Sequence, residues 1–267
     1  MKRDRMSRII TLTTDFGTRD GYAGAMKGVI LRINPEVWVV DVTHEIEPHD
    51  IAGAAFVIAG AYRYFPEETV HLVVVDPGVG GERRPIIVRT EDYLFVGPDN
   101  GVFSLIYRRE KRSRVIEISN PDLMLPEVSD TFHGRDIFAP AAAHMSKGVE
   151  LSRFGKEITD YVQIPFDEPR IKGDRLEGQI IHIDRFGNLI TNLSRDIFEA
   201  FVGERNFRIE VESKTLNRVC RSYSEVREGE LLVIFGSLGL LELSVNCGNA
   251  AELLRLRGGE RIIVERA

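Results

Sequence analysis

Cysteine is scarce in this chain. Only Cys220 and Cys247 occur in 267 residues, and their separation matches neither a zinc-ligand pattern nor a redox motif. A chain of this length can bury enough apolar surface to fold without disulfide bonds. We therefore expect two reduced thiols, with a disulfide between them as the less favoured alternative, and we exclude a fold that depends on disulfides.

The sequence also lacks a long hydrophobic run. The longest mildly apolar stretch, "IAGAAFVIAGAY" at 51–62, falls well short of the roughly 20 residues that span a bilayer. Near the start, the apolar run after the basic residues covers only Ile9–Leu12, which is too short for the core of a signal peptide. We therefore expect a cytoplasmic protein without membrane segments.

Positively charged residues are fewer than negatively charged ones. Lys and Arg total 35 against 41 Asp and Glu, which gives a formal net charge of −6. That balance argues against broad binding to a nucleic-acid backbone, although it leaves room for a local basic patch. The 43% hydrophobic and 28% charged residues are typical of a soluble protein with one large domain or two modest ones.

Strand and helix patterns alternate in the first part of the chain. Apolar runs typical of strands are separated by segments with helical spacing, and Asp50 precedes one of these as an N-cap. This order predicts an α/β fold with a mostly parallel sheet covered by helices. The expected strands are 9–14, 37–43, 69–76, the hairpin-like pair 85–90 and 93–98, and 114–119; the expected helices are 21–33, 50–65, 101–109 and 134–148, with Pro140 in the first turn or at a kink of the last.

Three acids follow the predicted parallel strands. Asp15, Asp41 and Asp76 each lie at the carboxyl end of such a strand. Right-handed crossovers bring these ends to a shared edge of the sheet, and ligands of open α/β sheets bind at that edge. We expect a binding site there.

Composition changes near 161–177, where prolines and charges replace periodic patterns. We predict an N-terminal α/β domain over 1–165, a linker over 166–176 and a C-terminal all-β barrel domain over 177–267. The last of these rests on short strand patterns separated by turn residues. They cover 178–184, 206–212, 230–237, 240–246 and 261–266.

Asp76 and Arg83 frame the glycine-rich stretch "DPGVGGER". A carboxylate before such a turn can simply accept bonds from the backbone. Alternatively, the glycines let the backbone approach a ligand closely while Arg83 returns to the site. A phosphate-binding loop is excluded, because no Lys-Ser/Thr pair follows.

His133 precedes a predicted helix and could cap it, pack against it or act in a site. Together with the strand-end acids it could also bind a metal, as in a metal-dependent hydrolase. The chain lacks the paired histidines typical of such centres, so we expect no metal site.

The remaining polar candidates lie at turns. Asp15 and Asp20, in "TTDFGTRDGY", suit hydrogen bonds to ribose hydroxyls and to a cation, although Asp20 could equally cap a helix. Polar residues at turns also occur in the second half, where turn formation is the simpler interpretation. They are Asp184, Asn188, Ser237 and Asn246.

Six motifs occur together in one order along nearly the whole chain. They are "TTDFGTRDGY", "VVDPGVGGERR", "GPDNG", "TFHGRDIFAP", "DRFGNLITN" and "VNCGNAAELL". In this order they resemble the S-adenosylmethionine (SAM) hydrolases, also called SAM hydroxide adenosyltransferases, which are relatives of the SAM-dependent fluorinase and chlorinase. The resemblance implies hydrolysis of SAM to adenosine and methionine without a cofactor. It also implies a homotrimer whose sites lie between the N-terminal domain of one subunit and the C-terminal domain of its neighbour.

The same resemblance assigns roles to residues. It implies that Asp76, Arg83 and His133 hold the attacking water and that Asp15 binds the ribose diol. The other implied contacts are Asp20, Asp184 and Ser237 for the methionine end, Asn188 and the 245–251 segment with Asn246 for adenine, and Phe132, Phe186 and Tyr223 as apolar walls.

Departures from the halogenase pattern favour hydrolysis. Asp76 replaces a tyrosine, Val79 and Gly134 stand where the halogenase branch has a hydroxyl side chain, and the long fluorinase insertion after 85–90 is missing. The alternatives are a SAM-dependent halogenase and an adenosine or SAM sensor without useful catalysis. Leu238 replaces an arginine that binds the methionine carboxylate in some relatives, so the partner of that carboxylate stays open.

Overall fold

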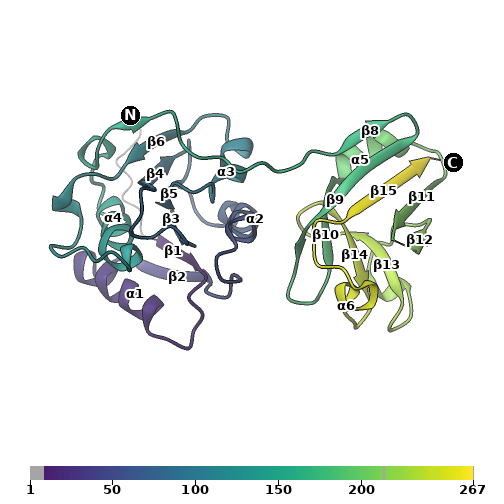
Figure 1. Ribbon diagram of the computed structural model, residues 1–267, viewed down its shortest axis with the longest axis horizontal. Helices are drawn as coiled ribbons and strands as arrows, with labels where there is room; N and C mark the ends of the chain where they lie inside the picture. The colour runs from purple at the N-terminus through teal and green to yellow at the C-terminus, as the bar shows by residue number, and fades with distance from the viewer. Residues whose placement is uncertain (1–8, 213, 267) are drawn as a thin grey trace. The chain divides into compact units, whose positions relative to one another are not determined.

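The computed structural model describes residues 9–212 and 214–266. The chain divides into two compact units, Met1–Pro165 and Phe166–Ala267. Each unit has its own sheet and its own hydrophobic core (Figure 1). None of the helices in the described ranges has the length and apolar character needed to cross a bilayer.

The first unit is built on a mixed sheet in the order β2-β1-β3-β5-β4-β6-β7. Neighbours from β2 to β5 run parallel, and β4, β6 and β7 extend the sheet in antiparallel pairs. This confirms the α/β prediction, including the hairpin-like pair β4–β5. The strands are β1 (Ile9–Thr14), β2 (Trp38–Thr43), β3 (Val70–Val74), β4 (Pro85–Arg89), β5 (Leu94–Pro98), β6 (Arg114–Glu117) and β7 (Glu157–Ile158).

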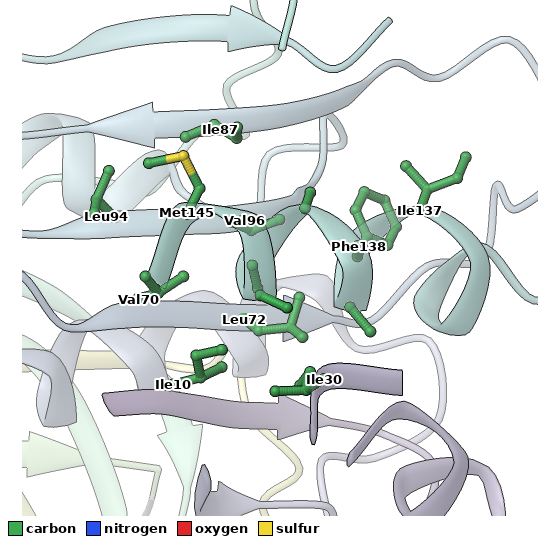
Figure 2. Close-up of a cluster of buried hydrophobic side chains, with 14 of the residues drawn as sticks. Ile10, Ile30, Val70, Leu72, Ile87, Leu94, Val96, Ile137, Phe138 and Met145 are labelled. Atoms are coloured by element: carbon green, nitrogen blue, oxygen red, sulfur yellow. The ribbon is translucent and has the colours of Figure 1, made fainter. Parts of the chain in front are cut away.

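Helices cover both faces of this sheet (Figure 1). On one face, α1 (Tyr22–Ile33) and α4 (Ala139–Ser146) pack on alternate residues of β1 and β3. Figure 2 shows this core, with Ile10 and Leu72 of the strands facing Ile30 of α1. On the other face lie α2 (Ile51–Ala61) and α3 (Ser104–Arg109). All five residues of β3 are buried, and four of them are apolar, because the strand is covered on both faces; His71 is the exception in type.

Two helix starts follow the local chemistry of the sequence. The Asp50 side chain caps α2 by accepting a hydrogen bond from the backbone N–H of Gly53 at 2.8 Å, as predicted. The segment predicted as one helix over 134–148 begins with a π-helical turn, η3 (Gly134–Phe138), and continues as α4. Pro140 lies in the first turn of α4, where its missing N–H is tolerated.

One of the three strand-end acids was misplaced by the sequence pattern. Strand β2 continues to Thr43, so Asp41 lies within it. There its carboxylate contacts the ammonium of Lys27 at 2.6 Å and the Nε2 of His44 at 3.0 Å. Asp15 follows β1 directly, and Asp76 lies two residues beyond β3, so these two do lie at the expected edge.

The second unit forms an antiparallel, barrel-like sheet in the order β12-β11-β15-β9-β10-β14-β13, which confirms the all-β prediction (Figure 1). Its core lies inside this sheet and under α5 (Arg195–Val202). The strands are β9 (Arg175–Ile183), β10 (Leu189–Ser194), β11 (Phe207–Val211), β12 (Lys214–Leu216), β13 (Leu231–Phe235), β14 (Leu240–Val245) and β15 (Arg261–Arg266); α6 (Ala250–Leu254) follows β14.

The segment predicted as a linker contains a short strand. β8 (Arg170–Lys172) pairs with β9 in a hairpin in which Lys172 lies opposite Arg175. Gly173, at φ 59°, allows the tight turn between them. The ladder supplies backbone hydrogen bonds that the polar sequence of β8 does not reveal.

Candidate active site

The loop from β3 to β4 closes on itself through an ion pair. The guanidinium Nε of Arg83 donates to both carboxylate oxygens of Asp76 at 3.0 Å, and its Nη2 donates to Oδ2 at 2.6 Å. Both side chains are largely buried, with 5% of Asp76 and 10% of Arg83 exposed. Burial of such charged groups is costly unless they are paired, so the ion pair fixes both side chains at the edge of the sheet.

His133 joins this pair from a distant part of the chain. The Nη2 of Arg83 lies 2.7 Å from its Nδ1. Since a guanidinium carries only donors, Nδ1 accepts this hydrogen bond, and in the neutral ring the proton then lies on Nε2. Burial, followed by the positive charge of Arg83, lowers the pKa of His133 below its ordinary value. The ring is therefore neutral at neutral pH.

Close packing of two loops brings these groups together. Gly80 has φ 75°, and a Cβ on it would lie 2.2 Å from the backbone oxygen of Asp130. Only glycine therefore lets the β3–β4 loop lie against the loop that leads to His133. The Arg83 guanidinium also lies over the ring of Phe138, 5.2 Å from its centroid. These contacts fix the direction of the guanidinium.

A pocket of about 320 Å³ opens beside Asp76 and His133. Asp15 lies on another wall, where its Oδ2 accepts a hydrogen bond from the backbone N–H of His49 at 2.9 Å. The pocket combines carboxylates with an apolar lining, as expected of a small-molecule site. It is lined by Asp15, Phe16, Tyr22, Pro48, His49, Val74, Asp76, Val79, Thr131, Phe132, His133 and Gly134.

Three aromatic rings form one side of this pocket. Phe132 contacts Phe16 edge-on at a centroid distance of 5.8 Å and Tyr22 at 5.2 Å. Of the three, the sequence analysis named only Phe132. The others lie in "TTDFGTRDGY", and aromatic residues next to the acids of a motif are the signal that could have identified them. Asp20, from the same motif, is exposed and does not line the pocket.

Gly134 lines the first pocket at a tightly packed position. A Cβ there would lie 3.2 to 3.4 Å from Phe132, Met26 and Val74. A larger side chain at this position would require these neighbours to shift.

The second unit carries a pocket of its own, of about 650 Å³. Among its lining residues are three that the sequence analysis proposed, Phe186, Asn188 and Tyr223. Phe186 is 76% exposed at the edge of this pocket. The others are Val245, Cys247, Gly248, Asn249 and Glu252.

Asp184 does not line this pocket, but it holds the turn that carries Phe186 and Asn188. Its Oδ1 accepts hydrogen bonds from the backbone N–H groups of Phe186 and Asn188 at 2.9 Å, and its Oδ2 accepts one from Nδ2 of Asn188 at 2.8 Å. Gly187 is needed in this turn, because a Cβ would lie 2.0 Å from Oδ1 of Asn249. Asn249, in the 245–251 segment that the resemblance assigns to adenine, also caps α6 by accepting a hydrogen bond from the N–H of Glu252.

Ser237 and Asn246 do not line the pocket of the second unit. Asn246 donates from Nδ2 to the backbone oxygen of Val226 at 2.9 Å, which supports the nearby loop. Ser237 lies in the turn between β13 and β14. In residues 9–212 and 214–266, no group of three or more His, Cys, Asp or Glu is arranged to hold a metal ion.

Two sequence models of one family match the chain. The N-terminal domain of the SAM hydroxide adenosyltransferases matches residues 10–155, and the C-terminal domain matches 178–263. The chain belongs to the SAM hydroxide adenosyltransferase family. The sequence resemblance is thereby confirmed over nearly the whole chain.

Relatives within this family are similar over their full length. A protein named (R)-S-adenosyl-L-methionine hydrolase from Salinispora tropica is 39% identical, with 96% of this chain and 97% of the relative covered. One of the same name from Methanocaldococcus jannaschii is 36% identical over 95% and 94%. A fluorinase from an Actinoplanes species is 28% identical over 97% and 98%.

A solved structure shares the fold. It is that of an uncharacterized conserved protein from Thermotoga maritima, with a TM-score of 0.90 and 38% sequence identity. The similarity covers 96% of this chain and 100% of that one.

Proposed function

We propose that this protein hydrolyses SAM to adenosine and L-methionine, through in-line attack of an activated water on C5′ of the ribose. One observation carries the proposal: Asp76, Arg83 and His133 form a continuous hydrogen-bonded set beside a pocket that also contains Asp15. Membership of the SAM hydroxide adenosyltransferase family and the hydrolase names of its relatives support the choice of substrate.

The difficult part of this reaction is the activation of the nucleophile. When the bond from C5′ to sulfur breaks, the sulfonium leaves as a neutral thioether and needs no general acid. Water, with a pKa of about 15.7, must instead be aligned and must lose a proton. Alignment of this kind can lower the barrier by several kcal/mol.

The hydrogen bond at Nδ1 of His133 supports Asp76 as the proton acceptor. Because Nδ1 of His133 accepts from Arg83, the ring faces the water with an Nε2–H donor. Asp76 is then the acceptor of the proton, through lone pairs that Arg83 leaves open. Arg83 stabilises the developing hydroxide and keeps Asp76 ionised. The positive sulfonium favours attack by this anionic nucleophile in a dry site.

The remaining substrate contacts are proposed from both units. Asp15 binds the ribose diol, and Phe132 stacks or packs beside it in the first pocket. The second pocket receives adenine through Asn188, Phe186 and Tyr223. Asp20, Asp184 and Ser237 hold the methionine end, and Asn246 belongs to the segment behind the adenine. We further propose a cytoplasmic homotrimer that needs no cofactor, in which each site joins the first unit of one subunit to the second unit of its neighbour.

The direct test is to incubate the purified protein with SAM and to follow adenosine and methionine by chromatography. Both sulfonium diastereomers should be supplied separately, because the names of the relatives specify the (R) form. Adenosine and methionine should appear in equal amounts. Absence of adenosine at high enzyme concentration and long times would overturn the proposal, and a halide-dependent product would point to a halogenase.

A further inference from the structure

Glu242, on β14, is a buried carboxylate without a partner. Its exposed fraction is 6%. The other buried acids of the described residues are paired, Asp99 with Arg84 at 2.7 Å and Asp136 with Arg135 at 2.6 Å. No described residue donates a hydrogen bond to the Glu242 carboxylate or forms an ion pair with it. Its oxygens are not among the fully enclosed, unpaired side-chain atoms of the described residues, so they stay open to a partner from outside the chain.

The direct cross-strand neighbours of Glu242 are apolar. Ile190 and Ile234 flank it on the neighbouring strands, and His182 lies one strand further along the same row. Burial, followed by the negative charge of Asp184, raises the pKa of Glu242 to about 7. The pKa of Tyr223 is raised by burial and then by these two acids. Glu242 therefore interacts electrostatically with a lining residue of the second pocket and with the acid that supports it.

Gly236 leaves the space that the Glu242 carboxylate occupies. A Cβ on Gly236 would lie 1.7 Å from Oε1 of Glu242, so no other residue fits at that position without moving the acid. Gly236 precedes Ser237, which the family resemblance assigns to the methionine end of the substrate. A reserved space for an unpaired acid, beside a proposed ligand contact, is characteristic of a site whose missing partner is a ligand.

We propose that Glu242 binds the α-ammonium group of the substrate, together with Asp184. This inference rests on the proposed function. SAM offers two cationic groups, and its sulfonium is bonded to the carbon that the water attacks, so the residues of the first unit face it. The ammonium lies at the far end of the methionine chain and is the cation left for the acids of the second unit. Binding it completes the hydrogen bonds that Glu242 lacks.

The test compares wild type and Glu242→Gln with two substrates, SAM and its analogue in which the ammonium is replaced by hydrogen. The amide keeps the shape of the side chain but removes the charge. A charge-assisted hydrogen bond contributes roughly 1.5–3 kcal/mol, so kcat/KM for SAM should fall by about tenfold or more, mainly through KM. The variant should process the deaminated analogue as the wild type does. Glu228→Gln, an exposed acid of the same unit, should match wild type with both substrates.

The outcomes separate failure of the Glu242 inference from failure of the proposed function. If Glu242→Gln loses activity equally with both substrates, or retains it with SAM, the inference is wrong while the proposed function stands. A wild type that yields no adenosine from SAM would refute the proposed function itself. Should the variant fold poorly, the wild type alone still tests the inference, because it must prefer SAM over the analogue by about tenfold or more in kcat/KM.

Discussion

At the scale of single residues, the site depends on one guanidinium that serves two partners. Arg83 donates to Asp76 and to His133 from the same edge, and its positive charge helps burial to keep the imidazole neutral by lowering its pKa. Lysine could not reproduce this planar arrangement of donors. The chemistry of the site therefore follows from the direction of a few hydrogen bonds.

Asp76→Asn should lower turnover by about 10²-fold or more, because the amide cannot take the proton of the water. Adenosine binding, measured by calorimetry, should persist. Asp41→Asn is a matched control, since Asp41 is an acid of the same unit that is paired with Lys27 and does not line the pocket. Equal loss of binding and rate in Asp76→Asn would indicate that Asp76 has only a structural role.

His133 should give the activity an acidic limb. Its pKa in the folded protein is lowered from 6.5, and protonation of Nδ1 would break the hydrogen bond from Arg83. The contribution of this bond is complete above pH 6.5 and is lost as the pH falls through the lowered pKa. A profile of kcat against pH should therefore fall on the acid side at a midpoint below 6.5. A midpoint clearly above that value would contradict the assignment.

At the scale of elements, the site is held by loops that pack through glycine. Gly80→Ala should reduce kcat strongly, because its Cβ would strike the backbone of Asp130 and separate Arg83 from His133. Gly173→Ala is the matched control: it has a similar φ, 59° against 75°, but its Cβ would meet no atom within 4 Å. Both variants should lose about 1 kcal/mol of stability in thermal melts from the unfavourable φ, and Gly80→Ala should lose more because of the backbone clash. Equal activity of the two would refute the argument.

The sequence predicted those elements whose signals are local. Asp50 marked the start of α2, and the apolar runs located β1 and β3. It did not identify β8, whose three residues include two charged ones and owe their strand conformation to pairing with β9. It also missed α5, although Ser194 caps that helix by accepting a hydrogen bond from the N–H of Ile197, a pattern visible in the chain.

The candidate site was predictable in its parts but not in its assembly. Arg83 lies seven residues from Asp76 across a glycine turn, so their contact could be inferred from spacing. The contact of Arg83 with His133 spans 50 residues and depends on how two loops pack. The family resemblance named that set, and pattern reasoning alone left His133 open. Glu242 escaped notice because a lone acid in an apolar strand carries no motif.

At the scale of the whole molecule, the proposed substrate contacts are divided between two units with separate pockets. If each site joins the first unit of one subunit to the second unit of its neighbour, two defective chains can restore each other. Asp76→Asn damages the first unit, and Phe186→Asp places a charge on an exposed ring of the second. Each variant alone should be nearly inactive.

Co-expression of these two variants should restore measurable adenosine production, since some neighbouring subunits then combine two intact halves. Native mass spectrometry should show that the active species is a mixed trimer. Mixed trimers without activity would mean that each site is built within a single chain.

The central claim is that a water held by Asp76, Arg83 and His133 attacks C5′ of SAM. Hydrolysis in water enriched in oxygen-18, followed by mass spectrometry of the products, tests it most directly. The account predicts that the label enters the 5′-hydroxyl of adenosine and is absent from methionine. Adenosine without the label, or label found in methionine, would contradict it.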